Sequence, residues 1–139
     1  MALERKNDLG TIKLDDYVFA QIVRAGFSTC QGKAFHASEK GKLLGNQGVA
    51  TSVGDISSNI KVNETEDRYE LEIYTIIRFG ESIRQTSKEI IDYIEYEMKG
   101  LFPEKGGKIT LNIVGIMSIK FKRIVPRDLK VIRRYEPQR

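Results

Sequence analysis

Few side chains in this sequence have types that support acid–base or nucleophilic chemistry. The chain has one cysteine, Cys30, and one histidine, His36, so a nucleophile paired with an imidazole base would have to use His36. His36 lies in a glycine-rich polar segment, where we expect a solvated loop residue. Cys30 ends an apolar helix face, where we expect a small core residue. We therefore predict no catalytic residues and no enzymatic activity.

Metal and cofactor sites are not expected either. One cysteine and one histidine form neither a disulfide nor the clusters that bind zinc, haem or iron–sulfur groups. Acidic residues cluster at a helix cap, a turn and a solvated helix face: Asp15–Asp16, Glu64–Asp67 and Glu95–Glu97. A phosphate-binding loop is excluded because Gly41-Lys42 is followed by Leu43 rather than Ser or Thr. We expect no metal, no cofactor and no small-molecule substrate.

One short motif has the spacing of a nucleic-acid contact. Gly45 and Gly48 form a G-x-x-G sequence, the loop with which KH domains hold a nucleic-acid backbone. A KH loop joins two helices, whereas residues 49–58 are rich in poor helix formers. Nucleic-acid binding through this loop and the basic C-terminal tail is therefore the alternative hypothesis.

Positive charge gathers at the C-terminal end. The 139 residues include 23 Lys and Arg and 19 Asp and Glu, a net charge of +4. Residues 117–139 hold eight basic and two acidic residues, so the other 116 residues carry a balance of −2. The candidate contact residues of this basic extension are Lys120, Lys122, Arg123, Arg127, Lys130, Arg133 and Arg134.

This extension also contains eight aliphatic or aromatic residues, more than a disordered tail usually carries. Two interpretations stay open. In one, the extension prolongs the last strand or packs its apolar residues on the domain or on a partner, and presents its cations to RNA, an acidic protein or anionic lipid. In the other, it is a frayed and solvated terminus.

The elements that position these residues follow from apolar spacing. Residues 11–14 predict a short strand, and residues 15–28 predict a helix that begins at Asp15-Asp16. Residues 33–58 contain four glycines and no sustained period, so we predict a long loop. Such a loop is unusual in a compact domain unless it is functional or disordered, which makes it a candidate working surface.

The second half of the sequence has clearer patterns. Residues 59–63 and 69–79 alternate apolar and polar types and predict an antiparallel hairpin, with Phe79 on the same face as the core residues. Tyr74 and Ile76 fall on the opposite face, which we expect to be exposed and to contact a partner. A helix is predicted from Ser82 to about Lys99, ended by Gly100, and a last strand over 108–116.

These elements predict one α+β domain, a two-layer sandwich. A small, mainly antiparallel sheet carries two amphipathic helices on one face, in the order β-α-β-β-α-β. We divide the chain into an N-terminal arm (1–9), this domain (10–116, with the loop 33–58) and the basic extension (117–139). The most apolar run, 109–119, is shorter than the roughly 20 residues of a membrane helix, and the first residues lack a signal-peptide core.

Several blocks of the sequence resemble the alkaline shock protein family of Gram-positive bacteria. The resemblance covers about residues 10–116 and rests on the order and spacing of the following blocks: Gly10-Thr11-Ile12-Lys13-Leu14, Ile60-Lys61-Val62, Leu71-Glu72-Ile73-Tyr74, Arg78-Phe79-Gly80, Lys99-Gly100-Leu101 and Leu111-Asn112-Ile113-Val114-Gly115-Ile116. The chain departs from the family pattern at Gly32-Lys33-Ala34 and by an insertion at 102–107.

The resemblance implies a small cytoplasmic, non-enzymatic protein of the envelope stress response. It also implies self-association into a homo-oligomer and docking to a protein partner, which in some members holds the protein at the membrane. Other members are linked to fatty-acid synthesis, so the resemblance extends to a role in envelope or lipid metabolism. The expected partners are therefore proteins, with nucleic acid as the alternative.

Overall fold

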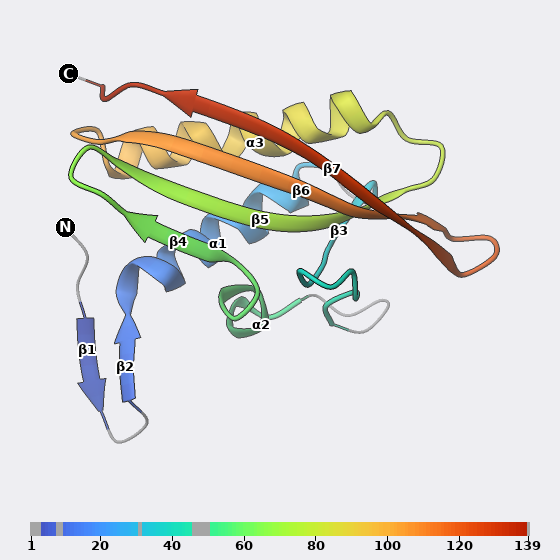
Figure 1. The fold of residues 1–139 in the computed structure, drawn as a ribbon, viewed down its shortest axis with the longest axis horizontal. Coiled ribbons are helices and arrows are strands. Elements are labelled where there is room, and N and C mark those ends of the chain that lie inside the picture. The colour runs from blue at the N-terminus through green and yellow to red at the C-terminus, as the bar shows by residue number, and fades with distance from the viewer. Residues whose placement is uncertain (1–3, 8–9, 31, 46–50, 139) are drawn as a thin grey trace.

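The computed structural model describes residues 4–7, 10–30, 32–45 and 51–138. A main sheet lies against helices on one side, and a small separate hairpin precedes them (Figure 1). The elements are β1 (Glu4–Asn7), β2 (Gly10–Lys13), α1 (Leu14–Ser28), β3 (Ala34–His36), α2 (Val53–Ser57), β4 (Lys61–Glu64), β5 (Arg68–Arg78), α3 (Ile83–Leu101), β6 (Gly106–Ser118) and β7 (Arg123–Tyr135).

The main sheet has five strands and confirms the predicted α+β class. Its order is β3-β5-β6-β7, and β4 pairs with β5 beside β3. All its pairs are antiparallel except the central pair β5–β6, which α3 connects as a crossover. The predicted hairpin is confirmed by the antiparallel register of β4 with β5, in which Val62 pairs with Leu71.

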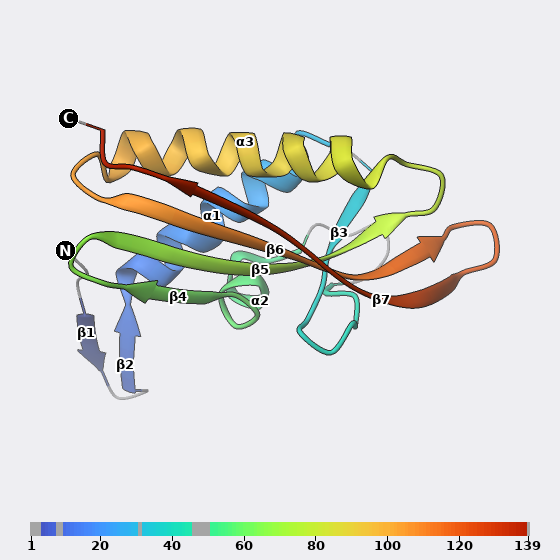
Figure 2. The ribbon, with the colours of Figure 1, turned by 45° about the horizontal axis from the view of Figure 1, so that its top comes forward.

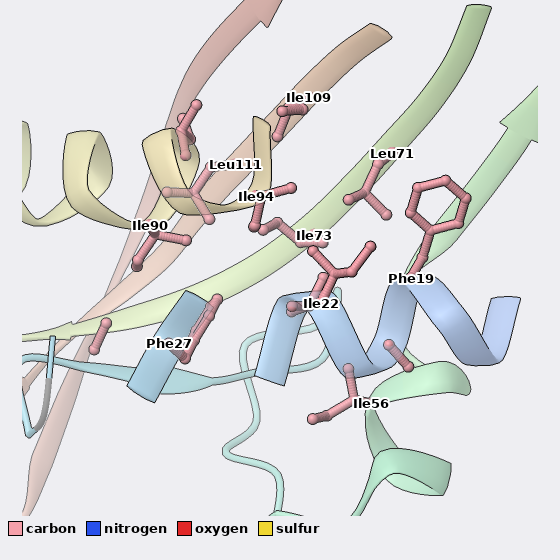
Figure 3. Close-up of a cluster of buried hydrophobic side chains, with 14 of the residues drawn as sticks. Phe19, Ile22, Phe27, Ile56, Leu71, Ile73, Ile90, Ile94, Ile109 and Leu111 are labelled. Atoms are coloured by element: carbon pink, nitrogen blue, oxygen red, sulfur yellow. The ribbon is translucent and has the colours of Figure 1, made fainter. Parts of the chain in front are cut away.

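The main core fills the space between the sheet and the helices (Figure 3). Alternate residues of β5 and β6 point to one face of the sheet, and the apolar stripes of α1 and α3 pack on that face. Contributors from these elements include Phe19, Ile22, Leu71, Ile73, Ile90, Ile94, Ile109 and Leu111. Both predicted helices therefore lie on the same side of the sheet, as the sandwich requires.

The ends of α3 agree only in part with the sequence prediction. Ser82 is the N-cap, and its hydroxyl accepts a hydrogen bond from the backbone N–H of Gln85 at 3.1 Å. At the other end, Gly100 does not end the helix. It lies in the last turn of α3, which runs to Leu101 with Phe102 as the C-cap.

The segment 33–58 is more structured than the predicted loop. It contains β3, which pairs with β5, and the five-residue helix α2. The hydroxyl of Ser52 accepts a hydrogen bond from the N–H of Asp55, and Ile56 is buried in the main core. These elements escaped prediction because three and five residues are too short to display a period.

The first predicted strand is present but lies elsewhere than expected. Residues Gly10–Lys13 form β2, which pairs with β1 (Glu4–Asn7) in a separate two-stranded sheet. The residues assigned to an N-terminal arm therefore supply one strand of this hairpin. The β2 strand leads directly into α1 rather than into the main sheet (Figure 1).

The basic extension belongs to the fold. β6 continues to Ser118, and the chain returns as β7 (Arg123–Tyr135) in antiparallel register with it, so that Ile113 pairs with Leu129. A strand, rather than a frayed terminus, therefore holds most of the basic residues. β7 is the last strand of the sheet, and its outer edge is unpaired among the described strands.

Candidate interaction surface on the β6–β7 hairpin

The expectation that Tyr74 and Ile76 are exposed is wrong. Both lie on the sheet face away from α1 and α3, as predicted, but they are 7% and 0% exposed. They form a second, smaller core with Ala37 and Met117. Tyr74 and Ile76 are buried because the chain after β3 and the end of the β6–β7 hairpin both pack over this face. Neither side chain is available to a partner.

Cys30 and His36 also lie in packed surroundings. Cys30 is buried, as expected, and burial raises the pKa of its thiol. His36 is not the solvated loop residue we expected, because it lies in β3 with its ring stacked on Phe27 at 4.1 Å between centroids. Burial first and the nearby Arg24 second lower the pKa of His36 to about 4. The imidazole is therefore neutral near pH 7.

The G-x-x-G motif is only partly described. Gly48 lies outside the described residues. Gly45 has a φ of +74°, which favours glycine. Before Gly45 the chain forms a β-bridge between Ala37 and Leu43 rather than a helix. The described surroundings thus differ from a KH loop, which joins two helices.

The second half of β7 (131–135, the anchored half) is fixed to α3. Arg133 donates hydrogen bonds from one guanidinium nitrogen to Asp92 at 2.6 Å and to Glu95 at 3.2 Å. Lys88 and then Arg133 lower the pKa of the Asp92 carboxyl. The predicted contact residue Arg133 therefore has its partners within the chain.

Tyr135 completes this attachment. Its ring packs against the main core, and the Lys99 ammonium lies 5.2 Å from the ring centroid. Gly107 is required beneath the ring, because a Cβ there would overlap Tyr135. Burial first and the Glu95 carboxylate second raise the pKa of Tyr135 to about 12.

The first half of β7 (123–129, the projecting half) has different surroundings. With the end of β6, it extends past the beginning of α3, so no helix covers it (Figures 1 and 2). A hollow of about 400 Å³ opens there. We call it the hairpin hollow. Its lining consists of Phe79, Ile116, Ser118, Phe121, Arg123, Val125 and Arg127.

Two aromatic rings are the most exposed apolar groups of this hollow. Phe79 and Phe121 are each 73% exposed. The sequence pattern placed Phe79 on the core face of its strand, which is wrong because β5 ends at Arg78 and α3 begins only at Ile83. The run of aromatic and aliphatic residues in 117–139 was the signal for the rest of the hollow.

Most predicted cations lie on this hairpin and are exposed. Lys120 and Lys122 are in the turn between the strands, where Lys122 has a φ of 50°. The others lie along β7: Arg123, Arg127, Lys130 and Arg134. Within the described part of the chain, none of these six side chains forms an ion pair. The hairpin therefore presents unneutralised positive charge beside an apolar hollow.

Membrane-spanning helices and metal-ligand clusters are both absent from the described residues. No helix among them has the length and apolar character to cross a bilayer. No group of three or more His, Cys, Asp and Glu residues is arranged there to hold a metal ion.

The fold and the hairpin together define a small α+β protein whose distinctive exposed feature is an apolar and basic surface. The chain belongs to the alkaline shock protein family, because the family model, described as having a cell envelope-related function, matches residues 4–118. This confirms the resemblance noted in the sequence. Comparisons with curated proteins and with solved structures gave no match. The matched region ends with β6, so β7 lies beyond it.

Proposed function

We propose that this cell envelope-related protein is a non-enzymatic interaction protein that docks to a protein partner near the membrane. The observation that carries the proposal is the hairpin hollow, where Phe79 and Phe121 are both 73% exposed. Apolar groups gathered on one exposed surface are typical of a protein-binding site. Because the main core is filled by its own side chains, the surface rather than the interior is available for binding.

The family membership supports an envelope role. We further propose that the protein is cytoplasmic and that its partner brings it to the membrane. Self-association into a homo-oligomer is the second form of the same proposal, since a second copy would also cover exposed apolar groups. Through either contact the protein would act in the envelope stress response, with an effect on envelope or lipid metabolism.

The test is a cross-linking pull-down from the native cell, read against matched variants. Phe79→Ser with Phe121→Ser removes the two exposed rings of the hairpin hollow. Tyr96→Ser is the control, because Tyr96 is 75% exposed on α3 and lies outside the hollow. We expect the double variant to lose the partner recovered by the wild type and by the control. Light scattering that shows a strict monomer, together with no cross-linked partner, would overturn the proposal.

Nucleic-acid binding remains the second candidate because six cations on the hairpin have no ion-pair partner among the described residues. Binding of this kind releases counterions and weakens steeply as salt rises. A filter-binding assay with RNA and DNA at low salt tests it. No retention of either nucleic acid would remove this candidate.

A further inference from the structure

We propose that the outer edge of β7 binds an extended acidic segment of a partner protein, which seats an apolar side chain in the hairpin hollow. The inference rests on the proposed function, because it specifies the chemistry of the docking partner. Three features of the hairpin lead to it: an open strand edge, an apolar hollow, and cations placed around that hollow.

The backbone of β7 offers the first feature. β7 has 13 residues and pairs only with β6 among the described strands. Its outward N–H and C=O groups are therefore arranged to pair with a further strand. Pro126 removes one N–H from the strand, yet an incoming segment still finds the remaining groups of the edge.

Side chains of the projecting half give the edge its chemical preference. Successive residues of a strand alternate between the two faces. Arg123, Val125 and Arg127 line the hollow together with Ile116, which packs against the main core on the helix side. An apolar position is thus flanked by two cations on one face. A strand with a central apolar residue and carboxylates on either side matches this order.

A second copy of the chain fits this edge poorly. Residues 123–135 contain five basic residues and one acidic residue, so two β7 strands side by side would bring two positive strands into contact. Directly opposed like charges destabilise strand pairing. Complementary charge steers association and excludes wrong partners. The charge of β7 therefore favours an acidic partner over self-pairing.

A nucleic acid would also be attracted by the cations, but it would leave two features unused. Phosphates do not fill an apolar hollow, and they do not pair with a strand edge as another strand does. An acidic extended segment uses the edge, the hollow and the cations together.

The first test measures binding of a defined peptide to the full chain. The probe is a short fluorescein-labelled peptide with a central phenylalanine, a valine on each side of it and a glutamate two residues away in each direction, so that the carboxylates share the face of the phenylalanine. The control probe has lysine in place of glutamate, and fluorescence anisotropy is the readout. We expect saturable binding of the acidic peptide only, weakened by added salt. Equal binding of the two peptides, or none, would overturn the proposal.

Charge-reversed variants place the peptide on the hairpin. Arg123→Glu with Arg127→Glu should weaken binding about tenfold, since two favourable pairs become repulsive. The control, Arg24→Glu with Lys40→Glu, makes the same change in net charge at two exposed positions outside the hairpin and should leave binding unchanged. Circular dichroism checks that each variant is folded. Equal weakening by both pairs would mean that only net charge matters, which contradicts the proposal.

Strand pairing has its own signature. Alternate N–H groups of a strand point to opposite edges, so methylating one alternate set of peptide nitrogens blocks one edge only. We prepare the acidic peptide in both methylated forms and expect one to bind like the parent and the other to lose binding. Equal affinities of the two forms would rule out pairing along β7.

Two further comparisons separate the possible failures. A labelled oligouridine that binds more tightly than the acidic peptide would show a polyanion site and overturn the inference. Peptide binding without any cross-linked partner in cells would instead count against the proposed function. A cellular partner that depends on Phe79 and Phe121, with no peptide binding to β7, would overturn the inference and leave the proposed function standing.

Discussion

The two halves of β7 carry similar residues but differ in what those residues contact. In the anchored half (131–135), Arg133 reaches the carboxylates of α3 and Tyr135 packs on the core. In the projecting half (123–129), Arg123 and Arg127 form no ion pair within the described chain and line an open hollow. Composition alone therefore does not decide the role of an arginine. What decides it is whether α3 lies beneath it.

The difference follows from the lengths of the elements. β6 and β7 each have 13 residues, whereas α3 begins only after the turn that follows β5 (Figure 2). The sheet is thus longer than its helical cover at the hairpin end. We expect the anchored half to contribute to stability and the projecting half to contribute to binding. The following experiments test this division of roles, and they are given in order from the largest expected effect to the smallest.

The largest effect should come from crowding the anchored half. In Gly107→Ala the new methyl group would overlap the ring of Tyr135, which must then leave its site on the core. Overpacking of this kind costs about 3 kcal/mol of the free energy of unfolding, measured by urea denaturation.

Gly100→Ala is the matched control for this variant. Its Cβ meets no atom within 4 Å, and Gly100 lies in the last turn of α3. Replacing a helical glycine by alanine should stabilise the protein by about 0.5–1 kcal/mol. A Gly107→Ala variant as stable as the wild type would show that the anchored half contributes little.

The second effect should appear at alkaline pH. The pKa of Tyr135 is raised from 10 to about 12 in the folded protein, so the unfolded chain loses this proton first. The stabilisation is complete below pH 10 and is lost as the pH rises through 12, and it amounts to about 2 kcal/mol. Tyr135→Phe lacks this titration. Urea denaturation between pH 9 and pH 12 should show a smaller decline for the variant, and equal declines would contradict a buried Tyr135.

The sequence predicted the layers of the fold well, because long amphipathic segments have a period that packing obeys. The stripe of α3 and the alternation of β5 both gave the correct buried face, as Ile90, Ile94 and Ile73 show. Prediction failed where the outcome depended on distant segments. Tyr74 and Ile76 were assigned to the right face, but residues far along the chain, Ala37 and Met117, bury them.

The candidate site shows the same limit. The sequence located the basic residues and the apolar residues of 117–139, but their order has no sustained period, so a strand, a tail and a partner-bound segment were all consistent with it. The separation of Arg133 from Arg127 depends on where α3 begins beneath β7. The hollow depends on Phe79, which lies at least 37 residues before the other residues of its lining. Neither relation is local, so neither leaves a pattern in the sequence.

The third effect compares two arginines of the same strand. Arg133→Met should cost about 1 kcal/mol, because it removes both carboxylate contacts from a partly exposed side chain. Arg127→Met should change stability by less than about 0.5 kcal/mol. The two variants have the same change in charge and shape. A difference between their urea denaturation midpoints therefore measures how much the contacts with α3 stabilise the protein.

Acid titration provides a check on that comparison. Lys88 and then Arg133 hold the pKa of Asp92 below its ordinary value of 3.8. A carboxyl whose pKa is lowered by folding stabilises the protein when the pH is above its ordinary pKa. This stabilisation is lost as the pH falls through the pKa of the folded state. The difference in the free energy of unfolding between the wild type and Arg133→Met should therefore shrink below about pH 4. A difference that is constant with pH would mean that Arg133 acts only through packing.

The smallest effect on stability should come from Phe121→Ser at the tip of the projecting half. Phe121 is 73% exposed, so its removal leaves no cavity and should shift the free energy of unfolding by less than about 0.5 kcal/mol. The same variant should bind the acidic peptide more weakly, since Phe121 lines the hollow that receives the apolar side chain. Urea denaturation and anisotropy on one preparation test both statements. A loss of stability would place Phe121 with the anchored half, whereas lost binding at unchanged stability separates the two halves by role.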